Sequence, residues 1–146
     1  MAKRDNKTLN ELLVTLFNSI MTTETKAVIT EEFKDVSHND MHIIEAIGIE
    51  EPRKMSEIAK RLGVTVGTLT TNMNSLERKN YVVRERGESD KRVVFVTLTE
   101  RGRKAFFHHR DFHKKMIKSV VAEFTPDEQV ILMRCLNKLN EFFVNG

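Results

Sequence analysis

Ala59 and Gly63 stand four residues apart, between two stretches that are typical of short helices. Two helices that cross closely need a small residue at the crossing and a residue that tolerates positive φ in the turn. The spacing therefore predicts a helix from about residue 56 to 62, a turn at Gly63, and a second helix with Thr65 as its N-cap. The apolar positions that we expect to fill the small core of this helix pair are Ile58, Leu62, Val64 and Leu69.

The second helix of this pair has apolar and polar residues on opposite faces. Helical spacing predicts a buried stripe made of Val66, Leu69, Met73 and Leu76. Small or hydrogen-bonding side chains without bulky charge occupy the opposite face, at Gly67, Thr68, Thr71, Asn74 and Ser75. Such a face can lie in a major groove, whereas a merely solvated helix surface more usually carries Glu, Lys and Gln. The composition favours a nucleic-acid contact surface over a solvated one.

Two stretches rich in β-branched residues follow, and they predict a hairpin. The strands are expected at 81–84 and 92–98, with a polar turn at 86–90 between them. The basic residues on and around this turn are Arg84, Arg86, Lys91 and Arg92. A basic two-stranded wing can contact phosphates and insert an arginine into the minor groove, although an ordinary charged turn has the same composition. We interpret Asp90 as a partner that holds the guanidinium of Arg92 or Arg86.

Basic side chains are concentrated in the middle of the chain. Residues 52–103 hold 12 Lys and Arg against 6 Asp and Glu, a net charge of +6, whereas the remainder carries −3. A basic segment between mildly acidic ends is typical of a nucleic-acid-binding region on a protein-contacting scaffold. A basic surface without any partner remains the alternative from charge alone.

Composition narrows the class of protein further. With 146 residues, 40% hydrophobic and 31% charged, the chain is long enough for a globular domain with extensions. Its one cysteine, Cys135, excludes an internal disulfide and fits a reducing cytosol, so we expect a cytoplasmic protein. The sequence has no apolar run of the ~20 residues that a membrane span needs, and we expect no signal peptide, because no apolar block follows the basic residues near the N-terminus.

Helices are expected on both sides of this central region. Apolar spacing predicts an amphipathic helix over the first thirty residues, and Ser37 with Asp40 predicts a capped helix that ends by Gly48. A long helix from Thr99 to about Glu123 precedes a last helix, whose start has Thr125 as N-cap, Pro126 at its first position and Glu128 as capping-box partner. The apolar stripe of the last helix is Leu132, Leu136, Leu139 and Phe143.

These elements predict a mainly α fold with a small β-hairpin wing, a winged helix-turn-helix. One such lobe cannot cover apolar stripes at both chain ends, so we expect a homodimer whose N- and C-terminal helices form the dimerisation region. The expected division is an N-terminal dimerisation helix at 1–36, a winged-helix lobe at 37–99, and C-terminal helices for dimerisation and effector binding at 100–146.

Four stretches carry a family resemblance: Met55–Val64 (MSEIAKRLGV), Leu76–Val82 (LERKNYV), Asp90 to Arg92 (DKR) and Val96–Gly102 (VTLTERG). In these the sequence resembles the MarR family of transcription regulators, along nearly its whole length. The resemblance implies that Arg92 enters a minor groove with Asp90 beside it. One common family pattern has Arg at the position of Lys91 and Gly at the position of Asn80. Asn tolerates the turn conformation that position 80 requires.

Together, composition and resemblance predict a DNA-binding repressor that recognises a pseudo-palindromic operator. The residues that we expect to contact duplex DNA are Thr65, Gly67, Thr68, Thr70, Thr71, Asn74, Ser75, Arg84, Arg86, Asp90, Lys91 and Arg92.

Further stretches are similar to the branch of the family that represses bacterial fatty-acid synthesis: Phe33–Ser37 (FKDVS), Val64–Thr71 (VTVGTLTT) and Phe112–Met116 (FHKKM). This resemblance implies control of fatty-acid-synthesis genes, with long-chain acyl-acyl carrier protein as co-repressor and no required cofactor. Bulky, adaptable side chains could line a tunnel for the acyl chain, although composition alone favours plain core. The candidate tunnel residues are Phe17, Ile20, Met21, Phe106, Phe112 and Met116.

A glutamate and three histidines form a candidate metal site. His109 and His113 stand four residues apart on one helix, a spacing that lets two imidazoles bind one ion, and Glu24 and His42 could complete a tetrahedral set. The same four positions resemble the ligands of zinc-responsive members of the MarR family. The alternative is a buried polar network without metal. His38 and His108 are expected at the surface.

The sequence favours a regulator over an enzyme. Arg110 occupies the position where an HExxH zinc protease needs its glutamate, and there is neither a Gly-rich phosphate loop nor a nucleophile elbow. Cys135 lacks a histidine partner fixed by spacing. A ligand-sensing interaction protein without DNA contacts is the remaining alternative, which salt-dependent binding to duplex DNA distinguishes.

Overall fold

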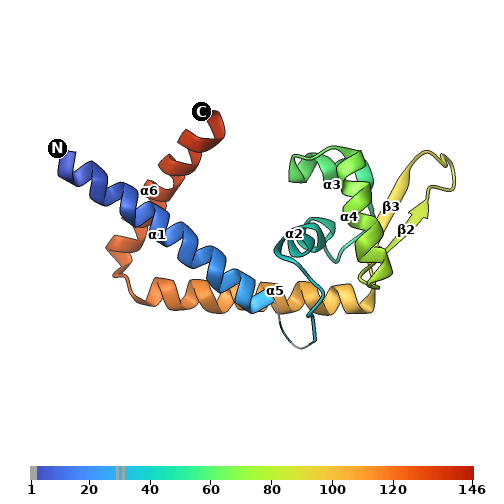
Figure 1. Cartoon of the computed structure of the whole chain (residues 1–146), viewed down its shortest axis with the longest axis horizontal. Helices are drawn as coiled ribbons and strands as arrows, with labels where there is room; N and C mark the ends of the chain where they lie inside the picture. Colours follow the sequence, from blue (N-terminus) through green and yellow to red (C-terminus); the bar gives the residue numbers. More distant parts are fainter. Residues whose placement is uncertain (1–2, 29, 31) are drawn as a thin grey trace. The chain divides into compact units, whose positions relative to one another are not determined.

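The computed structural model describes residues 3–28, 30 and 32–146. Its element order confirms the expected series of two helices, a helix-turn-helix, a hairpin and two further helices (Figure 1). The chain divides into two compact units, Met1–His109 and Arg110–Gly146. The boundary falls within helix α5 (Glu100–Ala122). The elements are α1 (Lys3–Val28), α2 (His38–Ile47), β1 (Arg53–Lys54), α3 (Met55–Leu62), α4 (Val66–Arg78), β2 (Val82–Arg86), β3 (Val94–Leu98), α5 (Glu100–Ala122) and α6 (Pro126–Asn145).

The turn between α3 and α4 has the geometry that the sequence predicts. Gly63 adopts the left-handed conformation with φ +68°. The Val64 N–H donates to the carbonyl of Ala59 at 3.0 Å and the Gly63 N–H to that of Lys60 at 3.2 Å, which is a Schellman ending for α3. The Thr65 hydroxyl then accepts from the Thr68 N–H and caps α4.

Two valines at this turn depart from the expected core. Ile58, Leu69, Met73 and Leu76 are buried and Leu62 packs against them, but Val64 and Val66 are 39% and 47% exposed. The prediction for these two residues is wrong. Val66 lines a groove beneath the wing instead of the core, because the first turn of α4 faces the hairpin.

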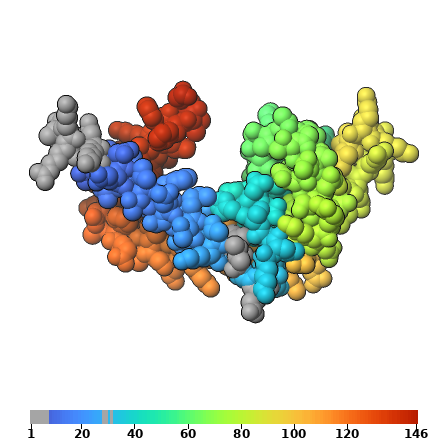
Figure 2. Space-filling model, in the orientation of Figure 1, coloured from blue at the N-terminus to red at the C-terminus, as the bar shows by residue number. Residues whose placement is uncertain are grey.

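The wing contains one strand more than the predicted hairpin. Strand β1 pairs antiparallel with β3, and the sheet order is β1-β3-β2, with Arg53 and Arg84 both opposite Val96. The strands of the hairpin also begin later than expected, at Val82 and Val94, and the first ends two residues later, at Arg86. Figure 2 shows the hairpin projecting from the surface formed by α3 and α4.

Polar contacts join the segment before α2, the turn between α4 and β2, and the start of α5 around Tyr81, whose side chain is fully buried. Its hydroxyl donates to Asp35 Oδ1 at 2.6 Å, the Arg101 guanidinium lies over its ring at 4.6 Å, and Arg101 also donates to Asp35. Burial and the carboxylate of Asp35 raise the pKa of Tyr81 to about 12. Gly102 completes the junction, since a Cβ there would overlap the Tyr81 carbonyl oxygen.

The terminal helices differ from this packed region. None of the residues of α6 is buried, and the described side chains of α1 expose Leu9, Leu12, Leu16 and Phe17. The N-terminus of α6 has the predicted capping box of Thr125 and Glu128 with Pro126 in its first turn. Within the described residues, no helix combines the length and the apolar character that a membrane crossing requires.

Candidate DNA-binding surface

Helix α4 presents a continuous uncharged surface. Gly67, Thr68, Thr71 and Asn74 are exposed, as is the capping residue Thr65 just before the helix. Thr70 and Ser75 are half-buried at the edges of this surface. A helix without bulky charged side chains on its outer face can approach base edges closely, as major-groove recognition requires.

Two threonines of α4, Thr70 and Thr71, direct their hydroxyl protons back to the helix. Thr70 Oγ1 donates to the Val66 carbonyl at 2.8 Å, and Thr71 Oγ1 donates to the Gly67 carbonyl at 3.4 Å. These two hydroxyl protons are therefore committed within the helix, and the two side chains offer acceptor lone pairs and methyl groups to a partner. These groups suit contacts with amino groups of bases and with thymine methyls.

The tip of the wing holds one arginine in a fixed position. Asp90 accepts three hydrogen bonds from Arg92, from the backbone N–H at 3.0 Å, from Nε at 3.1 Å and from Nη2 at 3.2 Å. These bonds lower the pKa of the Asp90 carboxyl. The Arg92 side chain is 92% exposed. The interpretation of Asp90 as the partner of an arginine is confirmed, and that arginine is Arg92.

Arg84 lies at the base of the wing. Its Nε donates to Glu77 Oε2 at 2.8 Å and its Nη2 donates to Asn74 Oδ1 at 2.6 Å. Both acceptors are on α4, so this arginine joins strand β2 to the helix. Its side chain is only 22% exposed.

A groove of about 430 Å³ separates the wing from the start of the helix-turn-helix. Its lining includes Arg84 and Arg92 of the wing, Lys54 and Ser56 of β1 and α3, and Val66 and Thr70 of α4. The sequence-based set of contact residues omits Lys54 and Ser56. Their positions depend on β1, a two-residue strand with no periodicity from which to recognise it.

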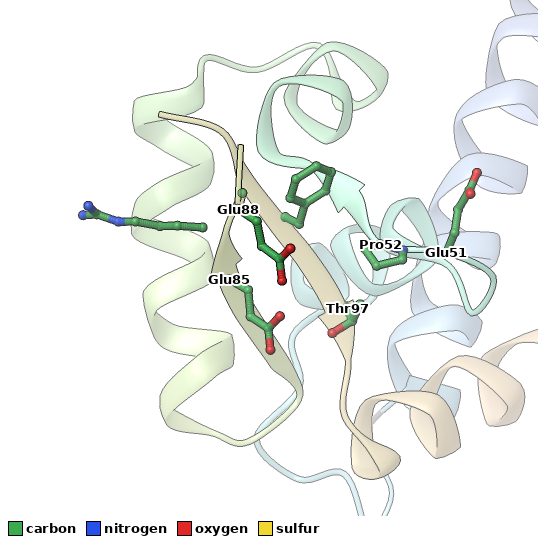
Figure 3. A pocket seen from close by; sticks show the side chains of 8 residues that line it. Glu51, Pro52, Glu85, Glu88 and Thr97 are labelled. Carbon is green, nitrogen blue, oxygen red and sulfur yellow. The ribbon is translucent and has the colours of Figure 1, made fainter. Parts of the chain in front are cut away.

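A second pocket of about 390 Å³ has the opposite charge. Figure 3 shows Glu85 and Glu88 on the hairpin, with Glu51 and Pro52 across the pocket from them. Arg86 also lines this pocket. The predicted wing contacts Arg86 and Arg92 therefore line different pockets, the first together with three glutamates and the second together with Lys54 and Arg84.

The candidate metal residues take part in a polar network. Glu24 is buried, and its Oε2 contacts His38 Nε2 at 2.9 Å. His109 Nε2 lies 2.7 Å from Glu45 Oε1, while the exposed His42 lies 3.8 Å from Glu45 and packs its ring on that of His38. A carboxylate oxygen of Glu24 and a ring nitrogen of His109 are within 4.8 Å of each other.

Two histidines depart from their expected surface positions. His38 is half-buried against Glu24, and His108 is half-buried with Nε2 at 3.0 Å from the Ala27 carbonyl. The expectation of plain surface residues is wrong for both. His113 follows one turn after His109 on α5.

The candidate acyl-tunnel residues have mixed exposure. Phe17 and Ile20 of α1 are exposed, whereas Met21 is half-buried. Phe106 packs against the core of the lobe, and the remaining two residues, Phe112 and Met116, are half-buried in the second unit. The tunnel remains a prediction.

The geometry and the sequence comparisons identify the class of this protein. The sequence model of the MarR family matches residues 34–93, the segment that holds α2, the helix-turn-helix and strands β1 and β2 and ends just before β3. The chain is also 36% identical to FabT of Streptococcus pneumoniae, solved in complex with DNA, with a TM-score of 0.90 and coverage of 96% of this chain and 98% of that one. The chain belongs to the MarR family of helix-turn-helix transcription regulators.

Curated relatives include further regulators of this type. The chain is 31% identical over 96 residues to YkoM of Bacillus subtilis, which is 66% of this chain and 62% of that protein. It is 33% identical over 91 residues to SarZ of Staphylococcus aureus, which is 62% of this chain and 53% of that protein. The chain thus spans less than two thirds of either relative.

Proposed function

We propose that the chain is a transcription repressor that binds a pseudo-palindromic operator through α4 and the wing. The observation that carries this proposal is the pairing of Asp90 with Arg92. Both carboxylate oxygens of Asp90 accept from the guanidinium of Arg92, which is exposed beside an uncharged recognition surface. In this arrangement α4 lies in the major groove, and Arg92 enters the adjacent minor groove, where negative potential attracts it.

The proposed DNA-binding unit is a homodimer. Apolar side chains remain exposed along α1 and α6 of one chain, which a second copy would cover. Two-fold symmetry presents two copies of α4 about 34 Å apart, matching two half-sites one helical turn apart. Such a dimer of a cytoplasmic regulator needs no further subunit to recognise a palindrome.

The proposed targets are fatty-acid-synthesis genes, with long-chain acyl-acyl carrier protein as co-repressor. The 36% identity to FabT over nearly the whole chain supports this branch of the family. The candidate acyl-binding side chains come from α1 and α5, which flank the lobe in sequence. A co-repressor acts only by its higher affinity for the conformation that binds the operator.

Operator binding tests the DNA-binding part of this proposal. With a labelled operator, Arg92→Ala should weaken binding and reduce the salt dependence by about one unit of log K per log salt. Thr71→Ala should relax the preference at one base pair, by about 1–3 kcal/mol, without changing the salt slope. Lys138→Ala, which removes a charge from α6, serves as the control. If the Arg92 and Thr71 variants both bind as the wild type does, the docking arrangement is wrong.

Zinc regulation is the second candidate, favoured by the approach of Glu24 to His109. The same titration separates the two. If acyl-acyl carrier protein is the co-repressor, its long-chain form tightens operator binding and a chelator changes nothing. If zinc is the effector, a chelator abolishes binding, zinc restores it, and His42→Ala or His109→Ala removes the response. Indifference to both effectors contradicts both candidates.

A further inference from the structure

Arg84 occupies the position where the wing meets the recognition helix, and its guanidinium is divided between two side chains of α4. Nε donates to Glu77 and Nη2 donates to Asn74, at 2.8 and 2.6 Å. The three residues close a ring that includes one turn of α4 and the middle of β2. A planar guanidinium that donates from two nitrogens fixes the direction of each acceptor more closely than the ammonium group of a lysine could.

The bond to Arg84 determines which way the amide of Asn74 faces. Amide oxygen and nitrogen are usually hard to distinguish, but a guanidinium has only donors. Asn74 must therefore turn its amide oxygen toward Arg84, and its NH2 group then points away from Arg84. Asn74 is exposed, so this NH2 group is available on the surface of α4 that faces the proposed DNA.

We infer that Arg84 is a positioning residue that makes Asn74 a hydrogen-bond donor toward bases. This inference rests on the proposed function. Asparagine recognises adenine with both amide atoms, accepting from N6 and donating to N7. Here one lone pair of the oxygen already accepts from a cationic group, and an adenine amino group that approached the second lone pair would be repelled by the positive charge of the neighbouring guanidinium. The free NH2 instead fits the keto oxygens of guanine or thymine.

The same geometry assigns Arg84 a small part in phosphate binding. Glu77 lies against the guanidinium and offsets its charge, and both acceptors keep the side chain directed at α4. Loss of Arg84 should therefore change base preference more than electrostatic affinity. Arg92, almost wholly exposed, should behave in the opposite way.

The experiment selects operators for the wild-type dimer from randomised duplexes, then measures single-base substitutions and salt slopes. We expect one position in each half-site to prefer a keto base by about tenfold, and Asn74→Ala to remove that preference alone. Arg84→Met should reduce it to less than about threefold or shift it to adenine, with an unchanged salt slope. Arg92→Ala is the matched control, which lowers the slope and keeps the preference.

Two results overturn the inference. One is an Arg84→Met variant that keeps the wild-type preference, either with an unchanged salt slope or with a slope lowered by about one unit, as a phosphate contact predicts. The other is a wild type whose preferences match those of Asn74→Ala. If Arg84→Met does not fold, Asn74→Asp replaces it, because a carboxylate keeps the bond to Arg84 and offers no donor; retention of the keto preference would then contradict the inference. A wild type that selects no operator instead disproves the proposed function itself.

Discussion

The winged-helix lobe and the terminal helices differ in how much of their apolar surface the chain itself buries. In the lobe, Ile44, Leu69, Met73 and Leu76 are all completely buried by contacts within the chain. In α6 no residue is buried, and Phe143 is 72% exposed. Both regions have helical apolar stripes in the sequence, so the stripe alone does not show whether a residue is buried by its own chain or requires another.

This difference predicts that the stability of the two regions depends differently on protein concentration. The lobe should unfold at a temperature independent of protein concentration, since its core is intramolecular. The terminal helices expose large apolar areas and should gain their stability by association, which depends on concentration. Four predictions test this contrast, from the largest expected effect to the smallest.

The largest effect is expected from a charge in the exposed stripe of α6. Leu136→Asp should yield a particle of 16.9 kDa instead of twice that mass, since a buried carboxylate opposes association. Because each monomer then binds one half-site, operator affinity should fall by about a hundredfold or more. Light scattering and operator titration measure the two changes. Asn137→Asp on the same helix is the control, and a wild type that is monomeric at micromolar concentration contradicts the contrast.

Inside the lobe, two glycines should respond in opposite ways to the same change. Gly102→Ala introduces a methyl group that overlaps the Tyr81 carbonyl, and should cost about 3 kcal/mol of unfolding free energy. Gly67→Ala, on the open surface of α4, should leave stability unchanged or raise it by up to about 1 kcal/mol through helix propensity. Urea unfolding at two protein concentrations measures both. Equal destabilisation by the two substitutions would show that close packing at Gly102 is not the cause.

The buried tyrosine gives the lobe a pH dependence of its own. Tyr81→Phe removes the bond to Asp35 and should cost about 2 kcal/mol near neutral pH. Since the folded-state pKa of Tyr81 is raised to about 12, this contribution is complete below pH 10 and is lost as the pH rises through the folded value. The wild type and the variant should therefore converge in stability at high pH.

Absorbance of the phenolate checks this directly, because Tyr81 is the only tyrosine in the chain. Its titration midpoint should lie near 12 in the folded protein and near 10 in urea. A single midpoint near 10 in both states would contradict the proposed role of Asp35.

Local signals in the sequence predicted much of this fold. The capping boxes at Ser37 and Thr125, the left-handed Gly63 and the positive φ of Asn80 all depend on neighbouring residues, and all are confirmed. The pairing of Asp90 with Arg92 belongs to the same class, because the two residues are adjacent in a turn.

Features that depend on distant residues could not be predicted in this way. The sequence predicts a DNA contact for Arg84 but not its bonds to Asn74 and Glu77, which span ten and seven residues and require the packing of β2 on α4. Strand β1 forms only because β3 offers an edge, and His38 is half-buried because Glu24 of α1 reaches it. The exposure of Val66 likewise depends on the groove that the hairpin forms.

The smallest effect is expected at the two capping boxes, one in each region. In the lobe, Asp40 accepts from the Ser37 N–H and also from Lys79, whereas Glu128 of α6 accepts only from the Thr125 N–H among the described residues. The bonds from Thr125 lower the pKa of the exposed Glu128 from its ordinary value of 4.5. Glu128 thus stabilises α6 above about pH 4.5, and this contribution is lost as the pH falls through the lower folded value.

Glu128→Gln keeps a capping-box acceptor and should change little at neutral pH, while it removes part of the acid sensitivity of α6. Asp40→Asn should cost more at neutral pH, because the buried Asp40 carboxylate also accepts from the ammonium group of Lys79. Helicity followed from pH 7 to 3 distinguishes the two variants. If Glu128→Gln is as destabilising at pH 7 as Asp40→Asn, the terminal helix depends on its own chain as much as the lobe does, and the contrast between the regions fails.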